Sequence, residues 1–412
     1  MMPKTNNIPE VRFAGFTDAW EQRKLSELAT MHARIGWQNL RTSEFLDSGD
    51  YMLITGTDFN DGAINYSTCH FVERERYEQD KHIQIKNGSI LITKDGTLGK
   101  VAYVQGLSMP ATLNAGVFNV EIRDETEVDN KYLFQYLKAP FLMDYVDKKA
   151  TGGTIKHLNQ NILVDFPVLL PSKAEQKAIG VYFERLDNLI TLHQRKYERL
   201  KNVKKSMLEK MFPKNGSNIP EIRFAGFTDA WEQRKLSDLI IEYKETVDSD
   251  CTLPVLTSSK TEGVVLQEEH FGRVQNHDIT GYNILPRNYC TYRNRSDGVD
   301  FTFNINRCCD KGIISKFYPV FYGNNSDIFF ISMVLNYCDE VVHEIAYTCT
   351  GTGQKVLSFL DLQKMNIRVP SYDEQKKISQ YFEQLDNLIT LHQRKLEKLQ
   401  NIKKMMLEKM FV

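Results

Sequence analysis

Two stretches of the chain carry apolar residues at the spacing of one face of a long helix. Residues 175–212 read EQKAIGVYFERLDNLITLHQRKYERLKNVKKSMLEKMF, and residues 374–411 read EQKKISQYFEQLDNLITLHQRKLEKLQNIKKMMLEKMF. With Ile179 and Ile378 taken as heptad position a, apolar residues recur at positions a, d and e over five heptads, and charged residues occupy the opposite face. The pattern predicts two long helices of roughly 55 Å each, at about 1.5 Å per residue.

Each predicted helix has an apolar stripe that needs a partner, and the other copy offers a matching stripe. Because a whole domain separates the two copies, we expect them to pair antiparallel about a pseudo-two-fold axis. The residues expected along this seam are Ile179, Leu186, Leu189, His193 and Leu200 in the first helix, and Ile378, Leu385, Leu388, His392 and Leu399 in the second.

His193 and His392 fall at the middle of the predicted seam, at heptad position a. A polar residue at such a position often fixes the register of a coiled coil, and this is the role that we expect. A metal site or a pH switch would need further ligands that the repeat does not supply.

Both helices begin with the same signal. Ser172 and Ser371 each stand three residues before a glutamate, Glu175 or Glu374. This spacing predicts a capping box, in which the serine accepts a hydrogen bond from the glutamate amide and the glutamate side chain reaches back to the serine amide. Pro213 is expected to stop the first helix.

A second repeat opens each half of the chain. Residues 8–28 read IPEVRFAGFTDAWEQRKLSEL, and residues 219–239 differ from them only by Val/Ile and Glu/Asp exchanges. We call these two segments the openers. Their tryptophans, Trp20 and Trp231, are interpreted as core anchors or subunit contacts.

The segments between opener and helix diverge, but both show strand-like runs and one helical patch, near residues 132–146 and 328–342. The predicted fold class is therefore mixed α/β, with two modules joined by two long antiparallel helices. The predicted boundaries are 1–171 for the first module, 172–212 for its helix, 213–218 for a linker, 219–370 for the second module and 371–412 for its helix.

Charge is distributed unevenly along the chain. The formal total is -1, yet residues 173–212 carry ten basic and five acidic side chains, and residues 373–412 carry eight and six. The two helices therefore sum to +7 and the remainder to -8. A protein that binds nucleic acid alone is usually basic, so we expect partners to share any DNA contact.

No motif for catalysis stands out. The sequence has no Walker A loop, no convincing S-adenosylmethionine loop, no His/Cys metal spacing and no nucleophile elbow, so we expect no catalytic residue, cofactor or metal in this chain. The seven cysteines form no CxxC pair, and the start has no apolar signal region. Reduced thiols and a cytoplasmic location are the expectation.

Three kinds of polar segment are candidates for DNA contact. One is the hairpin at residues 93–100, a second is the corresponding segment at 291–296, and the third is a small-residue turn that occurs at 151–156 and 350–355. Solvated hairpins and ordinary turns are the alternative interpretation. The candidate residues are Lys94, Asp95, Thr97, Lys100, Thr151, Thr154, Lys156, Arg293, Asn294, Arg295, Thr350, Thr352 and Lys355.

These features together resemble the specificity (S) subunit of type I restriction-modification systems, especially those of Gram-positive bacteria. The resemblance rests on the two openers and the two long helices and covers nearly the whole chain. It implies that each divergent segment is a target-recognition domain that reads one half of a bipartite DNA site in the major groove. It also implies that the helices are a spacer and a docking site for methyltransferase subunits.

The resemblance further implies partners. They are double-stranded DNA, two methyltransferase subunits that use S-adenosylmethionine to methylate adenine N6, and two restriction subunits that use ATP and Mg to translocate and cleave. Two alternatives stay open. One is the specificity subunit of a fused restriction-methyltransferase, and the other is a coiled-coil scaffold whose modules bind proteins.

Overall fold

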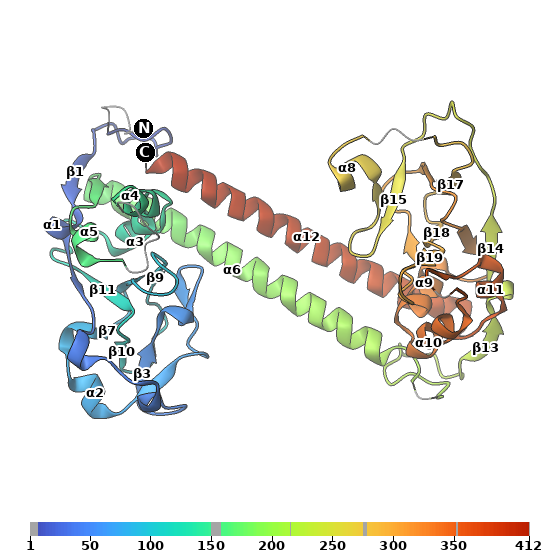
Figure 1. Ribbon diagram of the computed structural model, residues 1–412, viewed down its shortest axis with the longest axis horizontal. Coiled ribbons are helices and arrows are strands. Elements are labelled where there is room, and N and C mark those ends of the chain that lie inside the picture. Colours follow the sequence, from blue (N-terminus) through green and yellow to red (C-terminus); the bar gives the residue numbers. More distant parts are fainter. Residues whose placement is uncertain (1–6, 150–157, 215, 275–277, 352, 412) are drawn as a thin grey trace. The chain divides into compact units, whose positions relative to one another are not determined.

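Figure 1 shows a computed structural model of the chain, which describes residues 7–149, 158–214, 216–274, 278–351 and 353–411. The chain divides into two compact units, one made of residues 1–194 and 394–412 and the other of residues 195–393. Both predicted long helices are present, as α6 (Lys173–Lys210) and α12 (Tyr372–Met410), and each contributes residues to both units. Among the described residues, no helix has the length and apolar character that crossing a membrane requires.

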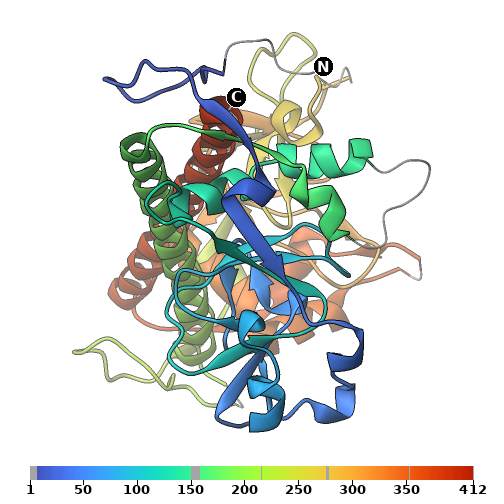
Figure 2. The same cartoon turned by 90° about the vertical axis from the view of Figure 1, so that its left-hand side faces the viewer.

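The first unit contains two four-stranded sheets, with strand orders β2-β11-β8-β9 and β6-β3-β10-β7. Strands β3 and β10 pair in parallel, and the other described pairs of these sheets are antiparallel. Figure 2 shows this unit facing the viewer, with its strands in blue and teal. The strands are β1 (Glu21–Lys24), β2 (Ala29–His32), β3 (Tyr51–Ile54), β4 (Phe59–Asn60), β5 (Ala63–Ile64), β6 (His70–Val72), β7 (Gln84–Ile85), β8 (Ile90–Thr93), β9 (Val101–Tyr103), β10 (Ala111–Leu113), β11 (Val117–Ile122) and β12 (Pro167–Leu170).

The helical patch predicted near residues 132–146 is two helices. Proline has no amide hydrogen to donate and restricts the residue before it, so the chain breaks at Ala139 and Pro140. The helices of this unit, besides its share of the long ones, are α1 (Leu25–Leu28), α2 (Arg74–Glu78), α3 (Asn130–Lys138), α4 (Phe141–Lys149) and α5 (Gln160–Val164). The short 3₁₀ turns are η1 (Gly36–Gln38), η2 (Thr42–Glu44), η3 (Gly56–Asp58) and η4 (Lys81–Ile83).

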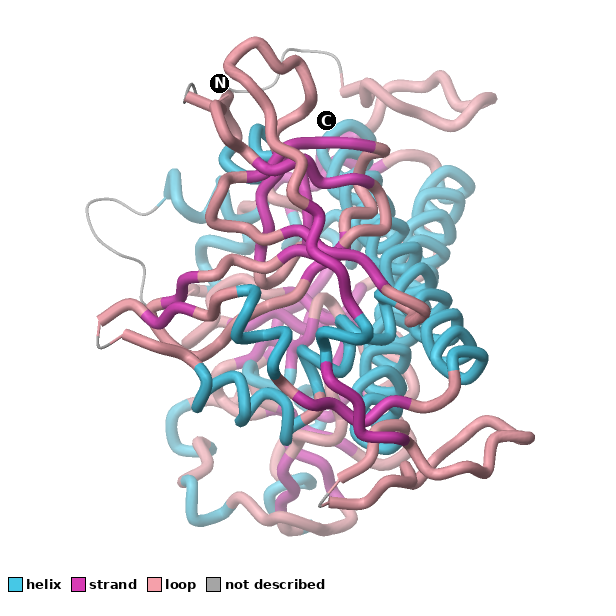
Figure 3. The backbone as a smooth tube through the Cα atoms, turned by 90° about the vertical axis from the view of Figure 1, so that its right-hand side faces the viewer, coloured by secondary structure: helices cyan, strands magenta, loops and turns pink. Residues whose placement is uncertain are grey.

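The second unit repeats the central sheet of the first. Its strand order β14-β22-β18-β20 matches β2-β11-β8-β9. In both sheets the strand after the opener pairs with the strand that precedes a buried helix, which is α3 in the first unit and α9 (Ile328–Tyr337) in the second. Figure 3 shows this unit facing the viewer, with strands in magenta. Its strands are β13 (Glu232–Lys235), β14 (Ile240–Tyr243), β15 (Leu256–Ser259), β16 (Gly263–Leu266), β17 (Asn283–Pro286), β18 (Cys290–Thr291), β19 (Arg295–Ser296), β20 (Asn304–Ile305), β21 (Lys311–Ile314), β22 (Val320–Gly323), β23 (Lys355–Val356) and β24 (Asn366–Val369).

The helical patch predicted near residues 328–342 is also divided, because Cys338 takes an extended conformation between two helices. The helices of the second unit are α7 (Leu236–Leu239), α8 (Gln267–Phe271), α9 (Ile328–Tyr337), α10 (Asp339–Thr348) and α11 (Phe359–Lys364). The mixed α/β class predicted from the sequence is confirmed in both units.

Each opener is bound into its unit in the same way. Its strand, β1 or β13, pairs antiparallel with the strand that leads into a long helix, β12 or β24, in the equivalent register. Trp20 and Trp231 follow the prediction of core anchors, since each is 2% exposed. The duplicated sequence therefore forms a duplicated framework.

A buried ion pair attaches the opener to the first turn of the long helix. Glu175 accepts hydrogen bonds from Nε and Nη2 of Arg12, at 2.7 and 2.8 Å. Glu374 accepts two from Arg223, both at 2.6 Å. Both carboxylates are fully buried, and the hydrogen bond to the glutamate raises the pKa of each arginine. Two parallel charge-assisted hydrogen bonds fix the orientation of the opener against the helix.

Of the two hydrogen bonds of each predicted capping box, the one accepted by the serine is present and the one accepted by the glutamate side chain is not. The hydroxyl of Ser172 accepts a hydrogen bond from the Glu175 amide at 3.4 Å, and that of Ser371 accepts one from the Glu374 amide at 3.5 Å. The glutamate side chains do not complete the box, because they bind the opener arginines. A guanidinium offers two charged donors, which a carboxylate binds more strongly than one backbone amide.

The glutamine after each glutamate joins the long helix to a second helix. Gln176 Oε1 accepts from the amide of Asp129, the N-cap of α3, at 2.8 Å. Gln375 Oε1 accepts from the amide of Asp327, the N-cap of α9, at 3.0 Å. Both glutamines also donate to the carbonyl of the proline five residues earlier, at 2.9 and 3.0 Å. These pairings satisfy glutamines that are 1% and 3% exposed.

The phenylalanine after the last turn of each long helix fills a core. In the first unit, Phe411 is fully buried and stacks on Phe183 of α6, with ring centroids 5.5 Å apart. In the second unit, Phe212 lies 5.9 Å from Phe330 and 6.4 Å from Phe382 of α12. In each unit, therefore, the start of one long helix packs beside the end of the other, and the predicted antiparallel pairing is confirmed.

The buried stripe on the long helices follows heptad positions a and e. At a helical repeat of 3.6 residues this stripe faces the partner, whereas position d turns away from it. The prediction that placed Leu189 and Leu388 in the seam is wrong, because each is 43% exposed. The register role of the histidines stays a prediction. Of the other seam residues, Ile179, Leu186, Ile378 and Leu385 are buried, and His193, Leu200, His392 and Leu399 are half-buried.

We expect Arg12→Met to destabilise the first unit by about 3 kcal/mol, because removing one partner of a buried ion pair leaves the other charge uncompensated. Urea unfolding monitored by proteolysis of this unit measures the loss. Lys24→Met is the matched control, since the Lys24–Asp165 pair is 59% and 55% exposed and an exposed ion pair contributes little to stability because water screens its charges. Equal losses in both variants would contradict the anchoring role of Arg12.

Candidate nucleic-acid interface

The second unit brings together two polar segments that the sequence suggested separately. Arg293 and Asn294 follow strand β18, and the turn at residues 350–355 leads into β23. Strand β19 pairs antiparallel with β23, so that Arg295 stands opposite Val356. The pairing places both segments at one end of the central sheet.

Asn294 belongs to the framework of this site. Its amide donates to the Phe317 carbonyl at 2.9 Å, and its carbonyl accepts from the Leu357 amide at 3.0 Å. Its side-chain oxygen is buried and has no hydrogen-bond partner among the described residues. We infer that Asn294 holds the segment in place while its two neighbours point outward.

The neighbouring arginines are exposed, and one of them is stacked on an aromatic ring. The Arg295 guanidinium lies over the Phe317 ring, 4.5 Å from its centroid. Burial raises the pKa of Tyr318, and the nearby positive charge of Arg293 acts in the opposite direction. Stacking on an aromatic ring limits the motion of a guanidinium and leaves its donors free for a ligand.

A pocket of about 600 Å³ opens beside these arginines. Its lining has three cations, Lys260, Arg293 and Arg295, against two acids, Asp297 and Asp300, for a formal charge of +1. Lys260 pairs with Asp300, and this hydrogen bond lowers the pKa of Asp300. Among the described residues neither arginine has an acidic partner, so the two guanidiniums are the uncompensated cations of the pocket.

A side chain of the turn at residues 350–355 hydrogen-bonds the backbone of the same turn. Lys355 Nζ donates to the Gly351 carbonyl at 2.9 Å, and Thr350 is exposed. Gly351 has φ +100°, and a Cβ there would lie 2.4 Å from the Gln354 carbonyl oxygen. The glycine is therefore required by the turn itself, and the ammonium of Lys355 contributes to closing it.

The corresponding loop of the first unit joins β8 to β9. Lys94 and Asp95 are half-buried there, whereas Thr97 and Lys100 are exposed. The Lys94 carbonyl accepts from the Leu158 amide at 2.8 Å, which is the counterpart of the Asn294–Leu357 bond. The Lys94 ammonium lies 5.5 Å from the centroid of Phe118. Four further candidates lie outside the described residues: Thr151, Thr154, Lys156 and Thr352.

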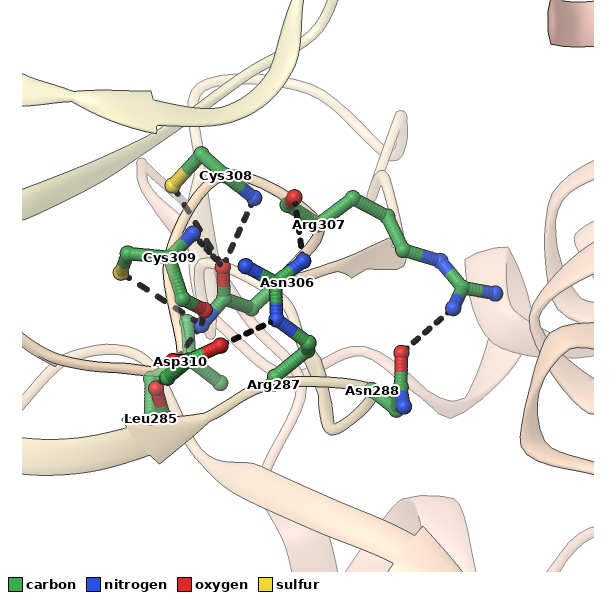
Figure 4. Close-up of polar contacts among 8 residues, drawn as sticks. All are labelled: Leu285, Arg287, Asn288, Asn306, Arg307, Cys308, Cys309 and Asp310. Atoms are coloured by element: carbon green, nitrogen blue, oxygen red, sulfur yellow. Dashed lines mark hydrogen bonds and ion pairs between the residues drawn. The ribbon is translucent and has the colours of Figure 1, made fainter.

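A second polar loop of the second unit, residues 306–310, was not singled out in the sequence. Figure 4 shows that Asn306 organises it. Its Oδ1 accepts from the amides of Cys308 and Cys309 at 3.1 and 3.3 Å, and its Nδ2 donates to the Leu285 carbonyl at 3.0 Å. Although Cys308 is exposed as a residue, partial desolvation of its thiol, followed by the neighbouring Cys309, raises its pKa to about 11, so this thiol stays protonated at neutral pH.

Two more arginines border this loop, but their charges are compensated. Arg287 Nε donates to Asp310 at 2.7 Å, and Arg307 pairs with Glu383 of α12 and donates to Asn288. They differ in this respect from Arg293 and Arg295. A sequence does not distinguish paired from unpaired arginines, because the acidic partner of Arg307 lies 76 residues away.

Comparison with known proteins identifies a family whose model matches this sequence. The model of the type I restriction modification DNA specificity domain matches residues 17–202 and 311–401. The chain is 24% identical to the type I restriction enzyme MjaX specificity subunit of Methanocaldococcus jannaschii over 97% of this chain and 95% of that protein. It is 23% identical to the MjaVIII specificity subunit of the same organism, over 93% and 94% of the two chains.

A solved structure shares the fold. The crystal structure of a type I restriction-modification system S subunit from M. genitalium superposes with a TM-score of 0.64, covering 98% of this chain and 99% of that one. The two sequences are 14% identical, so the likeness concerns the fold.

Proposed function

Because the chain belongs to the type I restriction modification DNA specificity family, we propose that each of its two units presents one reader to one half of a bipartite DNA site. The chain is a specificity subunit with two target-recognition modules. We take residues 1–171 and 219–370 as the recognition domains, 172–212 and 371–412 as the spacer helices, and 213–218 as the linker.

The observation that carries this proposal is a constant framework with different loops. The ion pairs of Glu175 and Glu374 and the hydrogen bonds of the two glutamines recur in both units with nearly equal distances. A phenylalanine after each long helix is also buried in both units. The loops that leave the central sheet differ, since seven residues separate β8 from β9 whereas the longer segment after β18 includes β19. Two readers of unlike sequence on one scaffold suit a target with two unlike halves.

In the second module, we propose that Arg293 and Arg295 contact the DNA. Both are exposed, neither has an acidic partner among the residues that the structure describes, and both border a concave surface. A guanidinium can donate two hydrogen bonds to guanine or to a phosphate. In the first module, the exposed Thr97 and Lys100 are the counterparts, with Lys94 and Asp95 as supporting residues.

The double variant Arg293→Ala/Arg295→Ala should lose sequence preference at one half-site and keep it at the other. A direct base contact contributes about 1–3 kcal/mol, so we expect affinity for the target to fall at least about tenfold. Selection from a random DNA library, with the subunit assembled on its methyltransferase partner, measures both effects.

Lys364→Ala is the matched control, because Lys364 is an exposed cation of the same unit that is paired with Asp361. Loss of preference at both half-sites, or at neither, would show that these arginines do not read one half-site.

The methyltransferase and restriction activities belong, in this proposal, to partner subunits, two of each, and the partners bring S-adenosylmethionine, ATP and Mg. Exposed leucines on the long helices support a docking surface. Leu189 and Leu192 of α6 are 43% and 46% exposed, and Leu388 and Leu391 of α12 are 43% and 45% exposed. Apolar side chains exposed at the same place in two copies of a repeat are typical of a surface that partners cover.

Leu189→Asp combined with Leu388→Asp should therefore weaken association with the methyltransferase subunits while leaving the fold intact, since neither leucine is buried. Co-purification from cells that express all subunits measures the association and also reveals whether the partners are separate chains. Leu360→Asp is the control, because Leu360 is 68% exposed on α11. Equal recovery of partners with both variants would place the docking surface elsewhere.

The long helices are proposed to set the gap between the half-sites, and the sharing of both helices by both units supports this role. Inserting four residues into each helix adds about 6 Å at 1.5 Å per residue, which is near two base-pair steps of about 3.4 Å. We expect the recognised gap to lengthen while both half-site sequences are kept. Methylome sequencing checks this, and an unchanged gap would disprove the spacer role.

A further inference from the structure

Three side chains of the first unit gather into a cluster of metal-ligand type that the DNA-recognition role does not use. They are His32 on β2, His82 on η4 and Glu121 on β11. One ligand atom of each lies within 4.8 Å of the ligand atoms of the other two. His32 is half-buried, and His82 and Glu121 are exposed.

The pairing of two strands brings His32 and Glu121 together. Strands β2 and β11 pair antiparallel with Thr30 opposite Glu121, so the side chains of His32 and Glu121 are diagonal neighbours on one face of the sheet. His32 Nε2 lies 3.7 Å from a carboxylate oxygen of Glu121. It also contacts the hydroxyl of Thr30 at 3.1 Å.

His82 is held over the same face from a different part of the chain. Its amide donates to Asp80 at 2.9 Å, and its carbonyl accepts from the Asn119 side chain at 3.0 Å. The rings of His32 and His82 are stacked, with centroids 4.5 Å apart and planes 20° apart. The backbone of η4 is thus positioned on the sheet, while the exposed imidazole of His82 can turn about its own side-chain bonds.

The separations suit a transition-metal ion. Zinc binds imidazole nitrogen and carboxylate oxygen at about 2.0–2.2 Å in tetrahedral geometry, which puts neighbouring ligand atoms roughly 3.4 Å apart. The 3.7 Å between His32 and Glu121 is close to that value. The separations to the His82 ligand atom are at most 4.8 Å, and rotation of this exposed ring can shorten them. Two imidazoles with one carboxylate favour zinc, nickel or cobalt over magnesium or calcium, which prefer oxygen ligands.

The second unit has no equivalent cluster at the matching positions of its own sheet. Strand β14 pairs with β22 in the same register, with Ile241 opposite Tyr322, and Tyr243 stands where the first unit has His32. None of these three side chains is a usual ligand for such an ion. A metal at this place would therefore be a property of the first module alone.

We propose that His32, His82 and Glu121 bind one divalent transition-metal ion, with water completing the coordination. The ion joins β2, η4 and β11. Along the sequence, His82 lies 50 residues after His32, and Glu121 lies 39 residues after His82. It therefore stabilises the folded form of the first module by binding it in preference to the unfolded chain. This inference is independent of the DNA-recognition role.

Titration of the reduced full-length protein with Co²⁺, followed by visible absorption and by equilibrium dialysis, tests the proposal. We expect one ion per chain, displaced by Zn²⁺, and a rise of several degrees in the thermal unfolding midpoint of the first unit. Mutating a residue that only hydrogen-bonds a metal ligand typically costs about 10–100-fold in metal affinity. Losing a ligand itself costs more, so His82→Ala and His32→Ala should each weaken metal binding by at least about 100-fold. The exposed position of His82 makes His82→Ala the variant that is least able to disturb the fold.

His70→Ala is the matched control, since His70 lies on β6 of the same unit outside the cluster. A Cys308→Ser/Cys309→Ser variant tests whether thiols bind the ion instead. Binding that is kept in the His70 and cysteine variants but lost in the His82 variant supports the proposal. The absence of one-to-one binding, binding that survives His32→Ala and His82→Ala, or binding that depends on the cysteines would each overturn it.

Discussion

The buried carboxylate at the start of each long helix is the constraint on which the rest of the structure depends. An ionised glutamate with no exposed surface is costly unless charged donors satisfy it, and the opener arginine supplies two of them. The adjacent glutamine then accepts from the N-terminus of α3 or α9. Two consecutive residues thus connect the opener, the long helix and the helix that covers the central sheet.

This framework explains how the two modules can differ without losing their fold. The variable segments are attached to it by main-chain hydrogen bonds, such as those from the Leu158 amide to Lys94 and from the Leu357 amide to Asn294. A main-chain hydrogen bond does not depend on the side chain of the residue that makes it. The exposed side chains of these segments can therefore change while the sheet, the ion pair and the packed phenylalanine stay as they are.

The sequence predicts the parts of this fold that repeat or have a long period. The long helices, their antiparallel pairing and the mixed α/β class follow from patterns that extend over many residues. The partner of Glu175 did not follow, because Arg12 lies 163 residues away and the local motif matched a capping box equally well. The exposure of Leu189 also escaped prediction, because an apolar residue at position d is ambiguous between a seam and a surface that a partner covers.

The candidate site shows the same division. Arg293 and Arg295 were recognisable as polar loop residues, but only the pairing of β19 with β23 places them beside the turn at residues 350–355. That neither arginine has an acidic partner in the described part of the chain could not be read from the sequence. The His32, His82 and Glu121 cluster was missed because its members come from three segments, and no spacing along the chain signals their meeting.

The position of Phe411 has a consequence for synthesis of the protein. This side chain packs in the core of the first unit, against Phe183 and Tyr132, although the ribosome adds it only after the whole of the second unit. The first unit, most of whose core residues precede residue 195, must therefore keep an open apolar site until the end of α12 has been translated. The second unit takes Phe212 from a helix already made, so it can close its own core sooner.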